Sequence, residues 1–437
     1  MANRQLDVHL DGVHMGSISM SAGGALSFRY ATDYLDRSSP TPLSLSMPLD
    51  ERTYPNRVVL PFLQGLLPDN DVALASMART YGVSAASPFA LLEHVGRDVA
   101  GALQILPPGQ LAEDATADRT DIAPIDDEEI TTRLAAAIEA YEDGRPVPNT
   151  QRMSLAGAQP KIGLAQLPDS RWGIPAPGVP TTHIFKPQRA GSSRFPDAAL
   201  VEVYCQSLAA AAGVRSSHTA FWTAPDASIS AVVSTRFDRA RRDDATVVRL
   251  HQEDFCQALS VSPAKKYQHI DGGPGISVMG RLLETRLLPE DSAQAATDLL
   301  AAATVNVALV NTDAHAKNYG LMLAGPHVSL APLYDVVSIA AYLGSGDSAT
   351  LPMRFGGTFS LSQVHPGALV EAGVQLGVPH GQAQAVVERV LGALARAIAP
   401  TAETLAGIDH TGIIEKTVTG LAQHSTLLRD YGETTAK

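Results

Sequence analysis

An octet of mostly polar residues gives the strongest sign of chemistry in this chain. It reads NTDAHAKN over residues 311–318 and directly follows an apolar stretch. Asp313 and Asn318 lie five residues apart in it. A carboxylate can accept a proton from a reacting hydroxyl, and an amide oxygen can bind a hard cation such as magnesium. Taken alone, the octet also fits a solvated loop with a helix cap.

A second carboxylate, Asp335, follows the octet in the run Leu-Tyr-Asp-Val. Between the two, residues 321–323 and 328–330 predict a short hairpin, with Gly-Pro at 325–326 as its turn. Magnesium prefers oxygen ligands, so a carboxylate at this place could bind it. Taken alone, Asp335 fits an ordinary turn residue.

Three upstream segments could bind a nucleotide. Small residues in SLAGAQPK, 154–161, allow N–H groups to cradle phosphate, although the segment is neither a Walker A motif nor G-x-G-x-x-G. Lys186 ends the apolar run THIFK, as a kinase strand delivers its lysine, and Glu202 on the next predicted helix could pair with it. HQEDF, 251–255, lies where a kinase hinge would bind adenine, but it also fits a strand-to-helix cap.

The joint order of these parts favours phosphoryl transfer. Phosphate loop, lysine, helix, hinge, catalytic loop and metal-binding aspartate follow one another as in protein kinases. In those enzymes an aspartate accepts the substrate hydroxyl proton and an asparagine five residues later holds magnesium, which is the spacing of Asp313 and Asn318. Each segment alone has an ordinary structural explanation, whereas all of them in this order favour a kinase.

Composition excludes several other classes of protein. The chain has 437 residues and a net charge of −12, which argues against a protein whose main task is to bind nucleic acid. Its two cysteines cannot form a disulfide framework or a four-cysteine zinc site, and they favour a reducing compartment. The longest apolar stretch, 299–310, is too short to cross a bilayer, and no signal peptide is visible. We therefore expect a soluble, cytoplasmic protein.

The elements that must position these residues change in type along the chain. Alternating apolar residues predict strands at 6–10 and 26–30, with Asp11-Gly12 as a hairpin turn. Asn70 and Ser87-Pro88 predict the starts of two helices. Further short strands are predicted at 163–167, 182–185, 232–233 and 247–248. Further helices are predicted after Asp126 and Asp197 and at 291–309, 380–398 and 412–428.

These elements predict an α+β fold in four segments. The first is a β-rich subdomain with helices over 1–110, and the second is a linker and helix over 111–149, acidic from Glu113 to Asp127. The third, 150–256, is mixed α/β and carries the phosphate loop and the hinge. The fourth, 257–437, is predicted to be all-α and carries the catalytic loop and the metal-binding aspartate.

The chain resembles the HipA family of bacterial toxin kinases. The resemblance covers nearly the whole sequence, and the combination of the octet with the SLAGAQ loop is specific to that family. It is carried by GLLPDN (65–70), GRDVAGALQ (96–104), SLAGAQPK (154–161), THIFKP (182–187), STRFDR (234–239), HQEDFCQ (251–257), NTDAHAKN (311–318), PLYDVVS (332–338) and LPMRFGG (351–357). It implies a bilobal, protein-kinase-like fold with an N-terminal β-rich subdomain and a mostly α-helical C-terminal lobe.

The resemblance implies a role for each matched residue, with ATP and Mg²⁺ as cofactors. Asp313 would be the catalytic base, and Asn318 and Asp335 would bind magnesium. Lys186 would contact the α- and β-phosphates, and His315 and Lys317 would act near the γ-phosphate or order the loop. The residues implied in ATP binding are Ala156, Gly157, Ala158, Gln159, Pro160, Lys161, Lys186, Glu253, Asp254, Phe255, His315, Lys317, Asn318, Tyr334 and Asp335.

Two residues of the phosphate loop have further implications. Ser154 matches the serine that family members phosphorylate on themselves, which expels the loop and inactivates the enzyme. A phosphate there would add about −1.5 to −2 charge beside an anion site, which gives a physical reason for expulsion. Pro160 stands where the best-known members carry an acidic residue, and it removes one N–H from the loop. We expect Pro160 to tune nucleotide affinity without abolishing it.

The resemblance also implies partners. Family members are neutralised by a small helix-turn-helix antitoxin, HipB-like, which supplies the DNA binding and agrees with the acidic charge of this chain. Their substrates are aminoacyl-tRNA synthetases, of which glutamyl-tRNA synthetase is the best known, and their action slows translation and growth. The sequence itself does not identify the substrate.

Other functions remain open at this point. A small-molecule kinase would share the same parts, although Ser154 favours a protein substrate. A non-catalytic ATP-binding co-repressor would not need Asp313, Asn318 and Asp335 together. Metal-dependent hydrolysis through Asp313 and His315 would need further clustered histidines.

Overall fold

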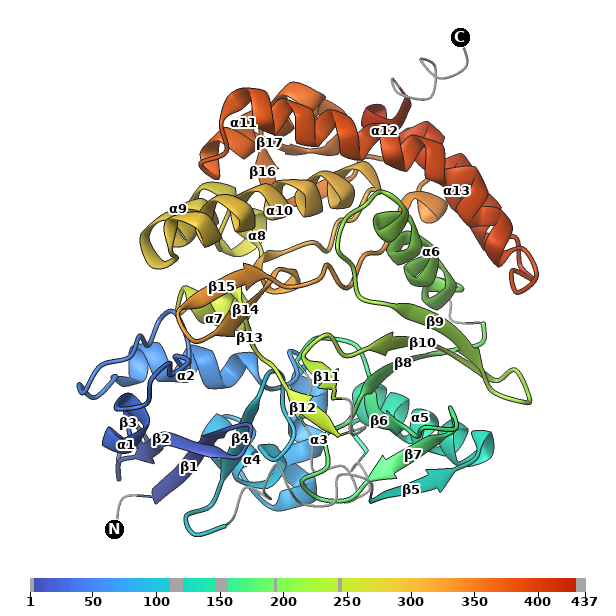
Figure 1. Cartoon of the computed structure of the whole chain (residues 1–437). Helices are drawn as coiled ribbons and strands as arrows, with labels where there is room; N and C mark the ends of the chain where they lie inside the picture. The colour runs from blue at the N-terminus through green and yellow to red at the C-terminus, as the bar shows by residue number, and fades with distance from the viewer. Residues whose placement is uncertain are drawn as a thin grey trace. The chain divides into compact units, whose positions relative to one another are not determined.

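The computed structural model describes residues 4–110, 121–145, 154, 156–191, 195–242 and 246–429. The chain forms two compact units (Figure 1). The first unit holds Met1–Pro187, Trp222–Ala264 and Met322–Pro326, and the second holds Gln188–Phe221, Lys265–Leu321 and His327–Lys437.

A four-stranded sheet opens the first unit, with strand order β3-β2-β1-β4. Its strands are β1 (Arg4–Leu10), β2 (Val13–Met20), β3 (Leu26–Tyr30) and β4 (Leu103–Leu106). Asp11 and Gly12 both have positive φ, as the predicted two-residue hairpin turn between β1 and β2 requires. Leu6 and Val8 of β1 are fully buried, which confirms the alternation read from the sequence.

Helices α1 (Thr32–Leu35), α2 (Asn56–Gly65), α3 (Asp71–Tyr81) and α4 (Pro88–Val95) accompany this sheet. The Asn70 side chain accepts hydrogen bonds from Val72 N and Ala73 N, and Ser87 accepts one from Ala90 N. Both predicted helix starts are therefore confirmed, because these side chains satisfy N–H groups that the first turn leaves open.

A second sheet has six strands in the order β5-β7-β6-β8-β10-β9. Their bounds are β5 (Ile122–Ile125), β6 (Ile162–Gln166), β7 (Trp172–Pro175), β8 (His183–Arg189) and β10 (Ile229–Thr235). Helix α5 (Asp127–Glu142) follows its N-cap Asp126, as predicted, and buries Ile130 and Leu134 in the same hydrophobic core as Phe185 of β8. The chain passes between the units within β9 (Thr219–Thr223).

Three short strands and a helix complete the first unit. They are β11 (Arg239–Arg241), β12 (Val247–Arg249), β13 (His251–Asp254) and α7 (Phe255–Ala258). The predicted acidic linker needs a correction, because β5 lies within it and pairs antiparallel with β7. Residues 111–120 of that linker lie outside the described residues.

The second unit is mostly helical (Figure 1). Its helices are α6 (Ala198–Ala211), α8 (Gln268–Asp271), α9 (Ile276–Arg286), α10 (Pro289–Ala308), α11 (Pro366–Gln375), α12 (His380–Leu405) and α13 (Ile413–His424). Helices α6, α10 and α11 all pack against α12. Asp197 stands at the start of α6 as predicted, but its φ is +57° and its side chain makes no capping hydrogen bond in the described structure.

The segment 257–437 is not all-α, which corrects the prediction. The chain forms β14 (Gly320–Ala324), β15 (His327–Leu330), β16 (Thr350–Phe355) and β17 (Thr358–Ser360) there. The hairpin of β14 and β15 was predicted, whereas the pairing of β16 with β17 was not. The predicted domain boundaries also differ from the two units, since α6 belongs to the second unit.

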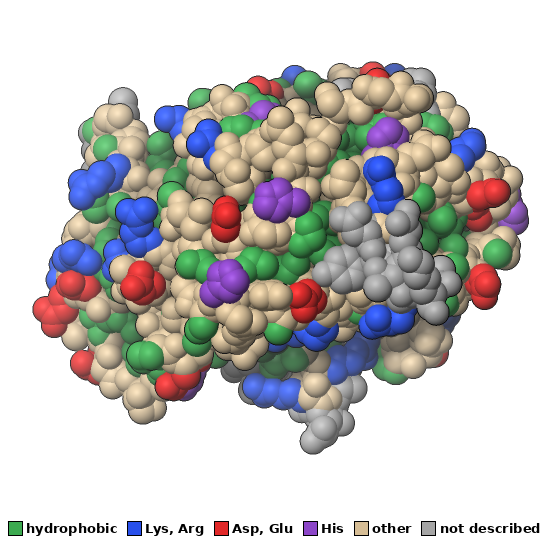
Figure 2. All heavy atoms as spheres, turned by 90° about the horizontal axis from the view of Figure 1, so that it is seen from above, with side chains coloured by type: hydrophobic (Ala, Val, Ile, Leu, Met, Phe, Trp, Pro, Cys, Tyr) green, Lys and Arg blue, Asp and Glu red, His purple; other side chains and the backbone are tan. Residues whose placement is uncertain are grey.

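The outer surface carries charges of both signs. Figure 2 shows Lys and Arg side chains close to Asp and Glu side chains on the face that it draws. Among the described helices, none is long and apolar enough to span a membrane.

Candidate active site

The second unit positions the octet 311–318 at the end of its central helix. Helix α10 is followed by Val310, whose φ of +60° turns the chain out of the helix. Asn311 is 1% exposed, and its Nδ2 donates to Asn306 Oδ1 at 2.8 Å. Asn306 Nδ2 in turn donates to the hydroxyl of Tyr319 at 3.0 Å. Buried amides therefore bind the loop at both of its ends.

Asp313 presents a half-exposed carboxylate on this fixed loop. Its side chain is 58% exposed, its N–H donates to Asn311 Oδ1 at 3.0 Å, and its carbonyl accepts from Asn318 Nδ2 at 2.8 Å. The hydroxyl of Tyr267 donates to Asp313 Oδ1, and His315 Nε2 lies 4.0 Å from the same oxygen. The structure thus places Tyr267 and His315 beside the Asp313 carboxylate, and Asn318 on the backbone carbonyl of the same residue.

Asp335 lies on the segment that follows β15. Its φ is +54°, a left-handed conformation that aspartate tolerates better than most residues. Its carbonyl accepts from Asn311 Nδ2 at 3.3 Å, and the neighbouring Tyr334 hydroxyl donates to Lys317 O at 2.7 Å. Both bonds join this segment to the octet. The segment that carries Asp335 and the loop that carries Asn318 are therefore fixed to each other.

The donor set of the second unit fits magnesium. Asn318 uses its amide nitrogen for the bond to Asp313, which leaves its oxygen to act as a ligand. Within the described part of the chain, no group of three or more His, Cys, Asp or Glu could hold a metal. Magnesium is usually bound by one or two carboxylates together with substrate phosphates and water, and the oxygens of Asp335 and Asn318 are ligands of the kind that it prefers, so the magnesium site stays a prediction.

The first unit holds the predicted phosphate loop. Gly157 has a φ of +115°, a conformation in which any other residue would be strained, and a Cβ there would lie 2.6 Å from Nζ at the end of the flexible Lys161 side chain. Lys161 Nζ donates to Ala156 O at 2.6 Å, which closes the loop on itself. Ser154 is 2% exposed and its hydroxyl donates to Leu66 O at 2.8 Å. Leu155 and residues 151–153 lie outside the described residues.

The predicted ATP-contacting lysine and its proposed partner belong to different units. Lys186 lies on β8 of the first unit and is 9% exposed. Glu202 lies on α6 of the second unit and is also buried. Their pairing remains a prediction.

The predicted hinge uses its side chains for structure. Asp254 and Gln257 form a capping box at the start of α7, which is the strand-to-helix cap considered from the sequence. Glu253 is fully buried and accepts from Ser44 Oγ at 2.5 Å and from Leu45 N at 2.8 Å. Burial raises the pKa of Glu253 to about 8, although the two hydrogen bonds oppose the rise. The N–H of Asp254 is also engaged, because it donates to Gln257 Oε1 at 3.0 Å. Binding of adenine through the backbone of this segment stays a prediction.

Two family matches cover most of the chain. Residues 153–398 match the HipA-like C-terminal domain, and residues 6–106 match the HipA N-terminal domain. The chain belongs to the HipA family. It is 36% identical over 421 residues to Y4mE, a protein of Sinorhizobium fredii that is named as a kinase, covering 92% of this chain and 94% of Y4mE.

Further relatives agree with this assignment. The serine/threonine-protein kinase toxin HipA of Shewanella oneidensis is 28% identical over 418 residues, covering 92% of this HipA-family chain and 90% of the relative. A solved structure of HipA with HipB and operator DNA from the same organism has a TM-score of 0.76 at 23% identity, covering 98% and 99% of the two chains. This HipA-family protein is a kinase with the expected α+β, kinase-like fold.

Sequence reasoning missed two groups of residues in this HipA-family chain. Tyr267, which contacts Asp313, gave no signal because it is distant in sequence and lies in an ordinary polar stretch. Asp98 and the arginines of STRFDR form a buried charge network in the first unit. The motifs that contain these residues supported the resemblance, but their charges were not connected with one another. The arginines and aspartates within these otherwise apolar segments could have indicated a buried charge network.

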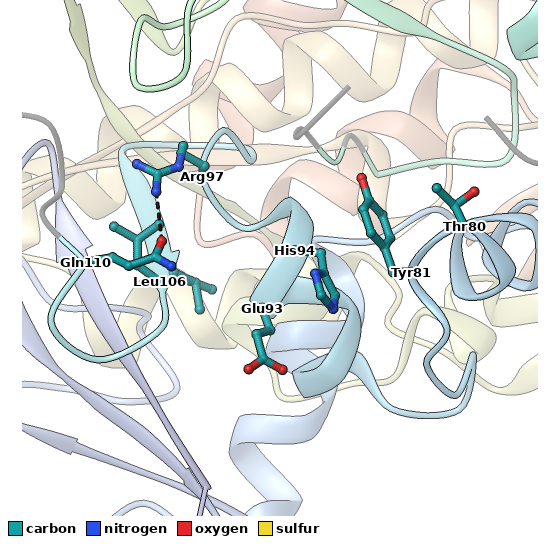
Figure 3. A pocket seen from close by; sticks show the side chains of 8 residues that line it. Thr80, Tyr81, Glu93, His94, Arg97, Leu106 and Gln110 are labelled. Carbon is teal, nitrogen blue, oxygen red and sulfur yellow. Dashed lines mark hydrogen bonds between the residues drawn. The ribbon is translucent and has the colours of Figure 1, made fainter. Parts of the chain in front are cut away.

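The HipA-family chain also has a surface pocket of about 430 Å³ in its first unit (Figure 3). It is lined by α3, α4 and the end of β4, with the rings of Tyr81 and His94 stacked at 4.7 Å. Arg97 donates to Gln110 at its edge. Of the predicted site residues that the structure describes, none is among its lining residues.

Proposed function

We propose that this HipA-family kinase is the toxin of a type II toxin–antitoxin system and transfers the γ-phosphate of ATP to a protein serine. One observation carries the proposal: the half-exposed Asp313 carboxylate is held by Tyr267 and lies beside His315, on a loop that is fixed by Asn318 and by buried amides. An exposed base on a rigid loop suits proton acceptance from a substrate hydroxyl, because its position is set before the substrate arrives.

Each remaining site residue has a proposed part in this reaction. Asn318 and Asp335 would hold Mg²⁺, which neutralises phosphate charge when bound. Lys186 would bind the α- and β-phosphates, and residues 156–161 would cradle phosphate through their N–H groups. His315 and Lys317 are buried and follow Asp313 closely in the sequence. They would order the loop or act near the γ-phosphate.

The substrate and the partner are proposed from the family. An aminoacyl-tRNA synthetase, such as glutamyl-tRNA synthetase, would be the protein substrate, and its modification would inhibit translation and growth. A HipB-like helix-turn-helix antitoxin would neutralise the toxin and supply the DNA binding. Support comes from the relative of known structure, which was solved with HipB and operator DNA. Residue Ser154 would be the inactivating autophosphorylation site, and its burial means that the loop must move before it can react.

The test is the intact mass of the purified protein before and after incubation with Mg-ATP. We expect the gain of one phosphate in the wild type and no gain in Asp313→Ala or Ser154→Ala. Asp313 is half-exposed, so its replacement should leave the fold intact, which a thermal melt checks. Binding of ATP without any transfer, starting from unmodified protein, would contradict the proposal and favour a non-catalytic co-repressor or a small-molecule kinase.

A further inference from the structure

Three contacts from the N-terminal subdomain, residues 4–106, hold the phosphate loop of the first unit. Leu66 O accepts from Ser154 Oγ at 2.8 Å, and Asp98 O accepts from Ser154 N at 3.1 Å. Asp69 N donates to Gly157 O at 3.0 Å, next to a parallel bridge between Pro68 and Gly157. The loop is therefore fixed at Ser154 and at Gly157 by backbone groups from outside the kinase-like part of the chain.

A buried charge network fixes Asp98, from which one of these contacts comes. Asp98 is 8% exposed, and its Oδ1 accepts from Arg239 Nη2 at 2.7 Å, with Arg236 Nη1 at 3.6 Å. Burial alone would raise the pKa of the Asp98 carboxyl, but Arg236, Arg239 and Arg249 hold it well below its ordinary value. Asp98 is thus a paired anion in the interior, and removal of its charge would leave the buried guanidinium groups of Arg236 and Arg239 paired with the single carboxylate of Asp238.

The same network fixes the backbone around Asp98. Arg236 Nη2 donates to Val99 O at 2.9 Å, and Arg239 Nη1 donates to Gly101 O at 2.8 Å. Asp238 Oδ2 accepts from Gly101 N at 2.7 Å. The segment 98–101 consequently has its peptide groups bound from both directions by the STRFDR motif, so the carbonyl that meets Ser154 has a defined position.

The network also reaches the strand that carries Lys186. Asp98 Oδ2 accepts from the hydroxyl of Thr181 at 2.7 Å and from its N–H at 3.2 Å. Arg236 Nη1 donates to the same hydroxyl at 2.8 Å. Thr181 lies just before β8, on which Lys186 is the fourth residue. One residue, Asp98, therefore contacts the phosphate loop through its backbone carbonyl and the segment before the lysine strand through its carboxylate.

We infer that Asp98 is a positioning residue, through which the N-terminal subdomain sets the phosphate loop and the lysine strand for nucleotide binding. The inference rests on the proposed function in that the loop and Lys186 are taken to bind ATP. It goes beyond that function because it gives residues 66–69 and 98 of the N-terminal subdomain a part in the kinase reaction. It also predicts that a weaker network releases Ser154 from its buried position.

The experiment measures hydrogen exchange of peptides that contain Ser154, together with KM and kcat for ATP, in Asp98→Asn. Asparagine keeps the shape of the side chain and removes its charge. We expect exchange at Ser154 and KM for ATP to rise about fivefold or more, with kcat changed less than KM, because bonds that hold the bound geometry are lost. Thr181→Val is the milder variant if Asp98→Asn does not fold, and Thr181→Ser, which keeps the hydroxyl, is its matched control.

The outcomes separate this inference from the proposed function. Unchanged exchange at Ser154 and unchanged KM in a folded Asp98→Asn or Thr181→Val would overturn the positioning role. Exchange that rises equally throughout both units would also overturn it, since that pattern reports only lower stability. If the wild type does not use ATP, the proposed function fails, but exchange at Ser154 still shows whether Asp98 controls the loop.

Discussion

The hydroxyl of Tyr267 donates a hydrogen bond to Oδ1 of Asp313, the predicted catalytic carboxylate. The Tyr267 ring also contacts His315 edge to face, with 4.8 Å between the ring centroids. One aromatic side chain thereby orients both the carboxylate and the histidine beside it. A base whose carboxylate is held in one orientation needs less reordering when the substrate hydroxyl arrives.

Tyr267→Phe tests this relationship, because it keeps the ring and removes only the hydroxyl. We expect kcat to fall about tenfold, since a hydrogen bond to a charged group contributes about 1.5–3 kcal/mol. KM for ATP should stay near the wild-type value. Tyr204→Phe is the matched control, because its hydroxyl donates to Ile398 O in the same unit and away from the octet. An undiminished kcat in Tyr267→Phe would show that the bond does not matter for transfer.

Asp335→Asn tests the proposed magnesium site. Asparagine tolerates the positive φ of residue 335, so the backbone should be retained while a charged oxygen ligand is lost. We expect phosphate transfer to fall at least about a hundredfold at low magnesium, with partial recovery at high magnesium, because metal binding is weakened. Initial rates measured against magnesium concentration check this. A variant with the wild-type magnesium dependence would exclude Asp335 as a ligand.

Gly157→Ala tests the conformation of the phosphate loop. The φ of +115° excludes ordinary side chains, and a Cβ would collide with Lys161 Nζ. We expect KM for ATP to rise about tenfold and the thermal midpoint to fall slightly, because the loop must leave this conformation. Gly23→Ala is the control, since its Cβ would meet only Ser21 Oγ, 4.0 Å away. Equal KM values for Gly157→Ala and the wild type would show that the described loop conformation is not the one that binds ATP.

Glu253 gives the stability of the first unit a pH dependence. Burial raises the pKa of its carboxyl from 4.5 to about 8, so the folded chain binds a proton that the unfolded chain has released between these values. The free energy of unfolding that this carboxyl contributes is fully present below about pH 4.5 and is lost as the pH rises through about 8. Burial lowers the pKa of neighbouring His251 from 6.5 to about 4, so its effect lies at lower pH.

The Glu253→Gln variant should therefore lose less stability than the wild type at alkaline pH. We expect its thermal midpoint, relative to the wild type, to improve as the pH rises from 6.5 to about 8.5, because glutamine has no proton to lose. Thermal melts of both proteins across this range provide the measurement. A difference between the two midpoints that does not change with pH would mean that Glu253 is not protonated in the folded state near neutrality.

Local chemistry explains which parts of the fold could be predicted from the sequence. The caps at Asn70 and Ser87 were predictable because each side chain bonds to N–H groups two or three residues away. The strand β5 was missed because acidic and small residues around it suggested a linker, while its stability comes from pairing with β7. The pair β16 and β17 was missed for the same reason, because the pairing of two strands depends on the tertiary structure around them.

The same difference between local and long-range contacts separates the site residues that were predicted from those that were missed. The octet was found because Asp313 and Asn318 are close in sequence, and the structure joins them directly. Tyr267 and Asp98 were not found, because their partners lie 46 and more than 100 residues away and only the folded chain brings them together. Composition shows that charged residues exist, but it does not show which of them are buried with one another.

The buried amides of the second unit have one further consequence. Asn306 and Asn311 hold the octet through neutral groups, and burial raises the pKa of Tyr319, the third member of the chain of bonds, far above neutrality. No side chain in this framework gains or loses a proton under ordinary cellular conditions. Acidification or alkalisation of the cell should therefore leave the geometry of this support unchanged.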